Sequence, residues 1–133
     1  MNKLPAVIIY QHTQDNGEEL RYTLRGLSNI TNWNGDVFVV GDHEDWFSAK
    51  INFIEMKRSA GRKHRDVYNK IRKIIGSKLI PDDFIFLNDD FFVTQKTEIK
   101  SWHQGELPRY TGHSNWLKVK NRTRAFLRNN FGI

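Results

Sequence analysis

Residues 6–10 read Ala6-Val7-Ile8-Ile9-Tyr10, a continuous apolar run rich in β-branched side chains. The run lacks the alternation of apolar and polar residues that marks a half-exposed strand, so it predicts a strand covered on both faces. Strands of this kind occur in parallel sheets, where helices lie against both sides of the sheet. We therefore expect an α/β fold around residues 6–10.

Three further segments have the composition of strands: residues 36–42, 51–56 and 84–87. Residues 36–42 and 84–87 contain continuous apolar runs and are expected to be buried, whereas residues 51–56 alternate between apolar and polar side chains. A turn over residues 80–83 precedes the last strand, because Pro81 disfavours a helical conformation in the residue before it.

Two helices are expected between these strands. Asn16, with Glu19 three residues later, forms an N-cap with a box-like partner and predicts the start of the first helix. The apolar face of this helix consists of Leu20, Leu24 and Leu27. The second helix begins at about Lys63, and one arc of it carries Val67, Ile71, Ile74, Ile75 and Lys78.

The order strand-helix-strand-strand-helix-strand predicts a mostly parallel sheet with helices on both faces. We expect one domain over residues 1–133, with the α/β core in residues 1–93 and a C-terminal extension in residues 94–133. Residues 94–113 have the composition of a loop. Trp116, Val119 and Phe126 are spaced as in an amphipathic helix, which also carries several basic residues.

The amino-acid composition limits the kinds of site and partner that this protein can have. The 133 residues include no cysteine, which excludes disulfides, zinc–thiolate sites and cysteine nucleophiles. The net charge of +6 favours anionic partners: phosphate-bearing small molecules, nucleic acid or acidic lipid. No apolar stretch approaches the roughly 20 residues that cross a bilayer, and no secretory cleavage site follows the first apolar run. We expect a cytoplasmic protein without a transmembrane segment.

The ends of the predicted strands carry most of the polar residues that are suited to chemistry. Because loops that follow parallel strands share one edge of the sheet, these side chains are expected to meet there. They are His12, Asp15 and Asn16 after the first strand, Asp42 and His43 after the second, Lys57, Arg58, Arg62, Lys63 and His64 before the second helix, and Asn88, Asp89 and Asp90 after the fourth strand.

Asp89 and Asp90 are adjacent carboxylates at the end of a predicted buried strand. Two such carboxylates repel each other, and burial raises the cost of ionising both. A hard divalent cation, Mg²⁺ or Mn²⁺, removes that cost and prefers oxygen ligands shared with substrate phosphates. Asn88 adds a further oxygen. The alternative is structural, with one aspartate capping a turn and the other facing water.

The segment before the second helix is strongly basic, with five cations within nine residues at Lys57, Arg58, Arg62, Lys63 and Arg65. These side chains could neutralise a diphosphate, together with backbone N–H groups at the helix start. The alternative is a solvated basic face, in which Asp66 pairs along the helix with Lys63 or Lys70. His12, His64 and Asp15 are the candidates for a catalytic base on an acceptor hydroxyl.

Three ordered motifs over residues 15–92 resemble the Stealth family of capsular-polysaccharide and N-acetylglucosamine-1-phosphate transferases. The first is Glu19-Leu20-Arg21-Tyr22-Thr23-Leu24-Arg25 after Asp15-Asn16, which is similar to the family's Asp-Asn-x-Glu-Leu-Arg-Tyr-Ser-Leu-Arg. The second is Trp33 before the strand that ends in Gly41-Asp42, followed by Asp45-Trp46. The third is Phe84-Ile85-Phe86-Leu87-Asn88-Asp89-Asp90, which resembles Phe-Ile-Tyr-x-Asn-Asp-Asp.

This resemblance implies a nucleotide-diphosphate-sugar-binding core akin to GT-A glycosyltransferases and Rossmann-like folds. It implies metal binding around Asp89 and Asp90, with Asp15, Arg21 and Arg25 as residues of the site or its support. The implied activity transfers a sugar or sugar-1-phosphate from a nucleotide-diphosphate-sugar, such as a UDP-sugar, to a hydroxyl of a saccharide or another acceptor.

Two other functions are compatible with the sequence. The chain could be a basic, non-catalytic module for nucleic acid or an anionic polymer, since Lys118, Lys120, Arg122, Arg124 and Arg128 lie along the predicted C-terminal helix. It could also be a degenerate transferase core that acts as a partner subunit, for which a homodimer is one expected form.

Overall fold

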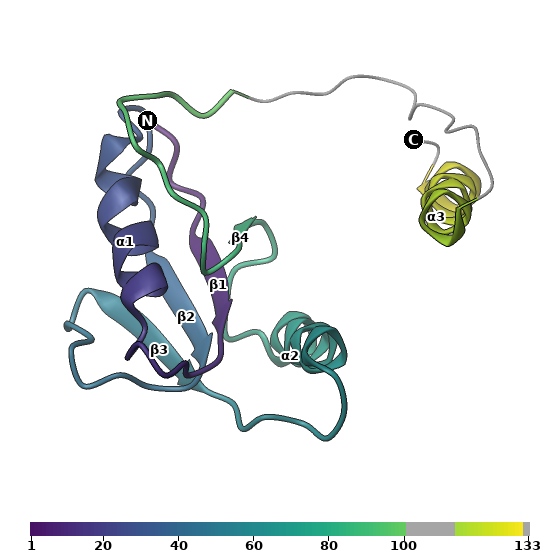
Figure 1. Ribbon diagram of the computed structural model, residues 1–133. Coiled ribbons are helices and arrows are strands. Elements are labelled where there is room, and N and C mark those ends of the chain that lie inside the picture. Colours follow the sequence, from purple (N-terminus) through teal and green to yellow (C-terminus); the bar gives the residue numbers. More distant parts are fainter. Residues whose placement is uncertain (101–113, 132–133) are drawn as a thin grey trace. The chain divides into compact units, whose positions relative to one another are not determined.

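The computed structural model describes residues 1–100 and 114–131. Its internal contacts divide the chain into two compact units, Met1–Ile99 and Lys100–Ile133. The first unit holds the sheet and two of the helices, and the second holds the C-terminal helix (Figure 1). Of the loop expected over residues 94–113, residues 94–100 lack helix and contribute only an isolated bridge at Thr97, and the remainder lies outside the described residues.

The first unit is a four-stranded parallel sheet with the order β3-β2-β1-β4. This confirms the predicted mostly parallel α/β arrangement. The elements in chain order are β1 (Ala6–Tyr10), α1 (Glu18–Gly26), the short 3-10 helix η1 (Leu27–Asn29), β2 (Val37–Gly41), β3 (Ile51–Glu55), α2 (Lys63–Ser77) and β4 (Ile85–Leu87).

Both faces of the central strands are covered, as the apolar run in residues 6–10 predicts. Val7 and Ile9 of β1 pack with Ile74 of α2 on one face. Ile8 and Tyr10 pack with Leu20 of α1 on the other. Figure 1 shows α1 and α2 on opposite sides of the sheet. Because successive side chains of a strand point to opposite faces, an unbroken apolar run is what this position requires.

The start of α1 differs from the prediction, which was wrong in making Asn16 the N-cap. Asn16 and Gly17 both have left-handed backbone angles, with φ of 56° and 75°, and the helix begins at Glu18 without a side-chain cap. A Cβ atom on Gly17 would stand 2.7 Å from the hydroxyl oxygen of Tyr10. Only glycine combines this backbone angle with such close packing.

Two burial predictions were also wrong. The fourth strand was expected to be buried, but Phe86 is 42% exposed because β4 is a short strand at the edge of the sheet. Ile75 was placed on one arc of the second helix with Ile74 and is 59% exposed. The buried stripe of α2 instead runs through Asp66, Lys70 and Ile74. Two charged residues therefore occupy positions that a purely apolar stripe would assign to hydrophobic side chains.

The second unit contains α3 (Asn115–Phe131), which confirms the predicted C-terminal helix. Its sequence has five basic residues and no acidic residue. Val119 and Phe126 are exposed on it. None of the helices within residues 1–100 and 114–131 is long and apolar enough to span a membrane.

Candidate active site

The strand order reverses at β1. The chain passes from β1 through α1 to β2 and then to β3 on one side, and α2 carries it back to β4 on the other side. In open parallel sheets, ligands bind outside the carboxyl ends of the strands at such a reversal. The loops that follow β1 and β4 therefore border the expected binding crevice. They carry His12 and Asp15 after β1, and Asn88, Asp89 and Asp90 after β4.

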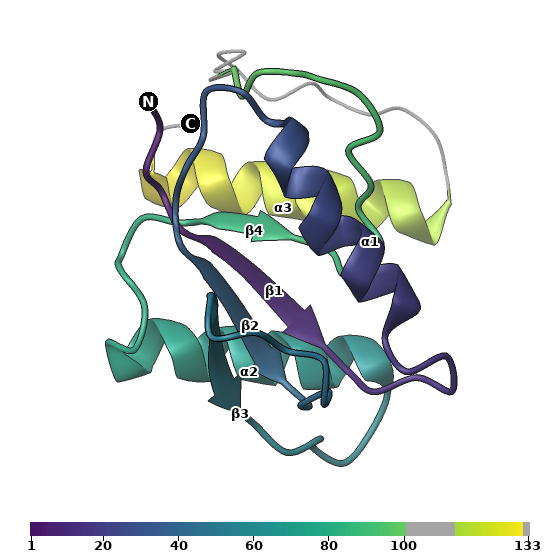
Figure 2. The same cartoon turned by 90° about the vertical axis from the view of Figure 1, so that its left-hand side faces the viewer.

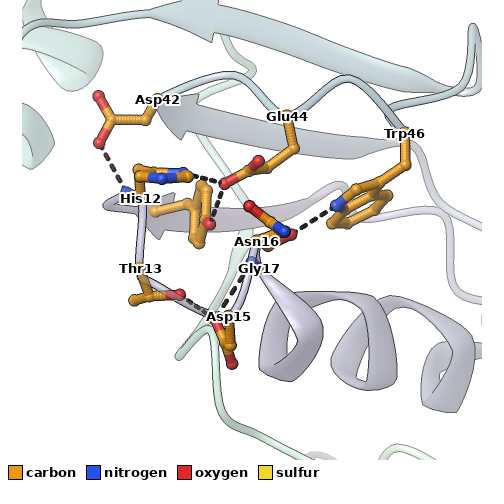
Figure 3. Close-up of polar contacts among 9 residues, drawn as sticks. His12, Thr13, Asp15, Asn16, Gly17, Asp42, Glu44 and Trp46 are labelled. Carbon is orange, nitrogen blue, oxygen red and sulfur yellow. Dashed lines mark hydrogen bonds and ion pairs between the residues drawn. The ribbon is translucent and has the colours of Figure 1, made fainter.

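His12 is paired with a carboxylate that sequence reasoning did not select. Its Nδ1 atom lies 2.5 Å from Oε1 of Glu44, and the same oxygen accepts a hydrogen bond of 2.5 Å from the hydroxyl of Tyr10 (Figure 3). Glu44 is buried, whereas His12 is exposed. Because a carboxylate only accepts hydrogen bonds, Nδ1 carries the proton and Nε2 is left to accept one.

Tyr10 serves as a donor in this arrangement. Burial raises the pKa of its hydroxyl, and the hydrogen bond to Glu44 raises it further. The phenol therefore keeps its proton, and its hydrogen bond fixes the position of the Glu44 carboxylate. The result is a histidine oriented by a buried acid, which resembles in geometry the base–carboxylate pairs of acid–base catalysis.

Asp42 and Asp15 order the loop that carries His12. An oxygen of Asp42 accepts a hydrogen bond of 2.7 Å from the backbone N–H of His12. Asp15 accepts hydrogen bonds from the hydroxyl of Thr13 and from the backbone N–H of Gly17, as Figure 3 shows. The hydrogen bond from Thr13 is the main reason why the pKa of Asp15 is lowered. The structure thus places Asp42 in contact with His12, and Asp15 within the same loop.

Asp89 lies half-buried at the end of β4. Burial raises the pKa of its carboxyl, the charge of Lys63 opposes this rise, and the charge of Asp90 adds to it. The carboxyl of Asp89 therefore senses the charges of both Asp90 and Lys63, the first residue of α2. The hydroxyl of Thr23 on α1 also donates a hydrogen bond of 2.7 Å to the backbone oxygen of Asp89, which fixes this loop against α1.

The donor set at this loop fits a divalent cation only if a phosphate shares it. Within residues 1–100 and 114–131, no three His, Asp or Glu side chains surround a common position. Asp89 and Asp90 supply two carboxylates, and the ionisation of Asp89 is disfavoured by its surroundings. Mg²⁺ is commonly held by one or two carboxylates, with water and substrate phosphates completing its ligand shell.

A buried polar cluster lies beneath the basic loop. Asp66 is 0% exposed and Lys70 is 2% exposed, and Lys70 Nζ lies 2.7 Å from Oδ2 of Asp66. Asp66 also accepts hydrogen bonds from the side chain of Gln11 and from the backbone N–H of Ser59, the latter at 2.6 Å. The sequence predicted an ion pair of Asp66 with Lys63 or Lys70, and in the structure the partner is Lys70. Asp66 thus ties the loop after β3 to the end of β1.

The predicted site residues at the start of α2 and after β4 include several that line a hollow or are exposed. Arg62 and His64 line a hollow of about 340 Å³ at the start of α2, together with Gly61 and Arg65. Arg58 and Asn88 are exposed. No hydrogen bond or ion pair among the described residues joins His64 to a carboxylate, so His12 has the orienting partner that His64 lacks.

Arg21 and Arg25 lie on α1, the helix that leads away from the carboxyl edge. The guanidinium of Arg21 stands 4.8 Å from the ring centre of Trp46, and Nη1 lies 3.0 Å from Oε1 of Glu18. Arg25 lies one turn further along the helix. The structure therefore separates Arg25 from the His12–Glu44 pair.

Comparison with family models, curated proteins and solved structures found no match. The resemblance to the Stealth family therefore stays a prediction that rests on the motifs within residues 15–92. The parallel sheet and the residues gathered at its carboxyl edge stand independently of that resemblance.

Sequence reasoning missed Glu44, Gln11 and the role of Tyr10. The only signal that could have found them is the strand pairing. Tyr10 pairs with Gly41, so residues a few positions beyond each strand end come together. Glu44 is otherwise one of several polar residues in a loop.

Proposed function

We propose that the protein is a metal-dependent transferase with a GT-A-like or Rossmann-like core, related to the Stealth family. It moves a sugar or sugar-1-phosphate from a nucleotide-diphosphate-sugar to an acceptor hydroxyl. One observation carries the proposal. An oriented histidine and a carboxylate of raised pKa, Asp89, follow the neighbouring strands β1 and β4, where the strand order reverses.

The diphosphate of the donor would bind between the loop after β4 and the start of α2. Asp89 and Asp90 hold the divalent cation, which when bound neutralises phosphate charge. The charge of Lys63 opposes the rise in the pKa of Asp89, so we assign its ammonium group to the same phosphates. Arg62 and the first backbone N–H groups of α2 supply further positive potential for the leaving group.

His12 acts as the base on the acceptor. Its Nε2 atom accepts the proton of the acceptor hydroxyl while that oxygen attacks the donor. Glu44 keeps the ring in the required tautomer and stabilises the imidazolium that forms. Attack at the sugar carbon releases a nucleoside diphosphate, whereas attack at the sugar-bound phosphorus releases a nucleoside monophosphate. Either bond change uses the same proton transfer to His12.

Calorimetry tests the donor site. Wild-type protein is expected to bind UDP-N-acetylglucosamine only when Mn²⁺ is present. Asp89→Asn/Asp90→Asn is expected to weaken binding at least about tenfold, because charge-assisted contacts are worth about 1.5–3 kcal/mol each. The matched control is Asp82→Asn/Asp83→Asn, an exposed pair of adjacent aspartates in the turn before β4. Equal loss in both variants, or binding that does not depend on Mn²⁺, would contradict the assignment.

The composition of α3 favours a second, non-catalytic function. We infer that this helix binds the phosphates of nucleic acid, since it has no acidic residue, and Lys118 and Arg122 are exposed one turn apart. Like charges at this spacing repel mildly, and an anion relieves the repulsion.

A gel-shift titration with duplex and single-stranded DNA tests this second function. Retardation is expected at 50 mM salt and is expected to weaken steeply towards 200 mM. Lys118→Gln/Arg122→Gln should reduce the slope of log affinity against log salt by about two. An absence of retardation at the lower salt concentration would rule out this function.

A further inference from the structure

The connection between β2 and β3 leaves a hollow beside the first residues of these strands. These strands are parallel, and residues 42–50 join them without a helix. Parallel neighbours are usually joined through a helix that covers the sheet. Figure 2 shows the loop crossing in front of β2 and β3. A cavity of about 590 Å³ lies here, lined by α1, by this loop and by the first residues of β2 and β3.

Three cations line this cavity: Arg21, Arg25 and Lys50. Arg21 is held by Glu18 at 3.0 Å and by the ring of Trp46. Arg25 and Lys50 are exposed, and neither forms an ion pair with any residue that the structure describes. Arg21 and Arg25 are one helical turn apart, so the cavity has uncompensated positive charge that favours an anion.

The remaining surface of the cavity is apolar and aromatic. Leu24, Val37 and Ile51 form part of it, with the indoles of Trp33 and Trp46. Both indole N–H groups are already bonded to backbone oxygens, Trp33 to Leu4 at 2.7 Å and Trp46 to Asn16 at 2.8 Å. The rings are therefore fixed in place, and Arg21 covers part of the Trp46 ring, 4.8 Å from its centre.

One lining residue of the cavity, Trp46, contacts the loop that carries His12. Trp46 donates its hydrogen bond to Asn16, and Asn16 lies in the same loop after β1 as His12 and Asp15, as Figure 3 shows. A chain molecule that extends from the cavity past Trp46 and Asn16 would bring one end towards the loop of His12. We define the groove as the cavity lined by Arg21, Arg25, Lys50 and Trp46.

We propose that the groove binds a saccharide bearing carboxylate or phosphate groups, and that this saccharide is the acceptor of the transfer. The C–H faces of sugar rings suit the indoles and the aliphatic floor, while the anionic substituents meet Arg21, Arg25 and Lys50. A volume of about 590 Å³ lies within the range of small-molecule sites. The role as acceptor site rests on the function proposed above; the binding itself does not.

Heteronuclear NMR titration tests the groove without nucleotide or metal. The probes are tetragalacturonate, a phosphorylated maltooligosaccharide and neutral maltotetraose. Saturable binding is expected for at least one anionic probe, with shifts in the amides of Arg21, Arg25 and Lys50. The tighter of the two anionic probes identifies carboxylate or phosphate as the substituent. Maltotetraose is expected to bind at least about tenfold more weakly, because it lacks the charge-assisted contacts.

Two exposed cations allow a matched pair of variants. Arg25→Gln/Lys50→Gln is expected to lower the affinity for the anionic probe at least about tenfold. Lys73→Gln/Lys96→Gln removes the same amount of charge from exposed positions outside the groove. Its affinity for the anionic probe is expected to stay within about twofold of wild type, because salt screens distant surface charges.

The outcomes separate this proposal from the donor site. Asp89→Asn/Asp90→Asn should bind the anionic saccharide as wild type does, even if nucleotide-sugar binding proves absent in every variant. The groove assignment is overturned if neither anionic probe binds, if maltotetraose binds equally well, or if both double-charge variants lose affinity equally.

Discussion

Replacing Asp66 with alanine is expected to lower the free energy of unfolding by about 3–5 kcal/mol, because it leaves a buried ammonium without its counter-charge. Lys70 is 2% exposed, and its Nζ atom lies 2.7 Å from Asp66. The substitution also removes the acceptor for the backbone N–H of Ser59 and for the side chain of Gln11. Urea denaturation at pH 7 measures the change.

A double substitution separates the ion pair from general packing. Asp66→Leu/Lys70→Met is expected to be less destabilised than Asp66→Leu alone, because removing both charges leaves no unpaired buried charge. The control is Lys78→Gln, which breaks the exposed pair between Lys78 and Asp82 and is expected to cost at most about 1 kcal/mol. An Asp66→Ala variant within about 1 kcal/mol of wild type would refute the role given to the cluster.

The same cluster predicts how stability depends on pH. Burial by itself raises the pKa of Asp66, but hydrogen bonds from Lys70, Ser59 and Gln11 outweigh it and lower the pKa. A lowered pKa in the folded state adds stability above the unfolded value of about 3.9, and this stability is lost as the pH falls further. Stability measured from pH 6 to pH 2 should therefore fall more steeply for wild type than for Asp66→Asn.

Replacing His12 with glutamine is expected to slow the proposed transfer by about 10²–10⁴-fold, the usual contribution of a positioned base. The ring is oriented through Nδ1 by the carboxylate of Glu44, which also accepts a hydrogen bond from the hydroxyl of Tyr10. Release of nucleotide from UDP-N-acetylglucosamine in the presence of Mn²⁺ and acceptor measures the rate. The identity of the nucleotide distinguishes the two bond changes, since UDP indicates sugar transfer and UMP indicates sugar-1-phosphate transfer.

His43 provides the matched control for His12. It lies in the same region, but its ring packs edge-on against Phe47 and Phe53 at 5.1 and 5.0 Å. His43→Gln is expected to leave the rate within about threefold of wild type, whereas Glu44→Gln should slow it by at least about tenfold through loss of ring orientation. Wild-type turnover by His12→Gln, or an equal loss in His43→Gln, would remove His12 from the reaction.

The strand and helix order could be predicted because it depends on local pattern. The apolar run in residues 6–10, Leu20 of α1 and Leu27 of η1 are buried as their spacing indicates, and Leu24 is partly buried. The start of α1 could not be predicted in the same way. The N-cap preference of Asn16 is a weak local effect, and the packing of Gly17 against Tyr10 outweighs it.

The candidate site was predicted in part. The placement of His12 and Asp89 at one edge follows from parallel strands, which the sequence indicates. Glu44 could not be selected, because Asp42, His43 and Asp45 beside it are equally polar. Nor does the spacing of Asp66 and Lys70 reveal that they are buried, since most pairs at this spacing lie on exposed helix faces.

The sequence by itself determined the α/β class, the order of the elements and the carboxyl-edge position of His12, Asp89 and Lys63, because hydrophobic periodicity decides which segments are buried. Only the tertiary structure decided that Glu44 orients His12, that Asp66 and Lys70 are buried together, and that the helix-free loop in residues 42–50 leaves a groove. These features join residues distant in sequence or depend on what covers a face, so strand pairing and packing decide them.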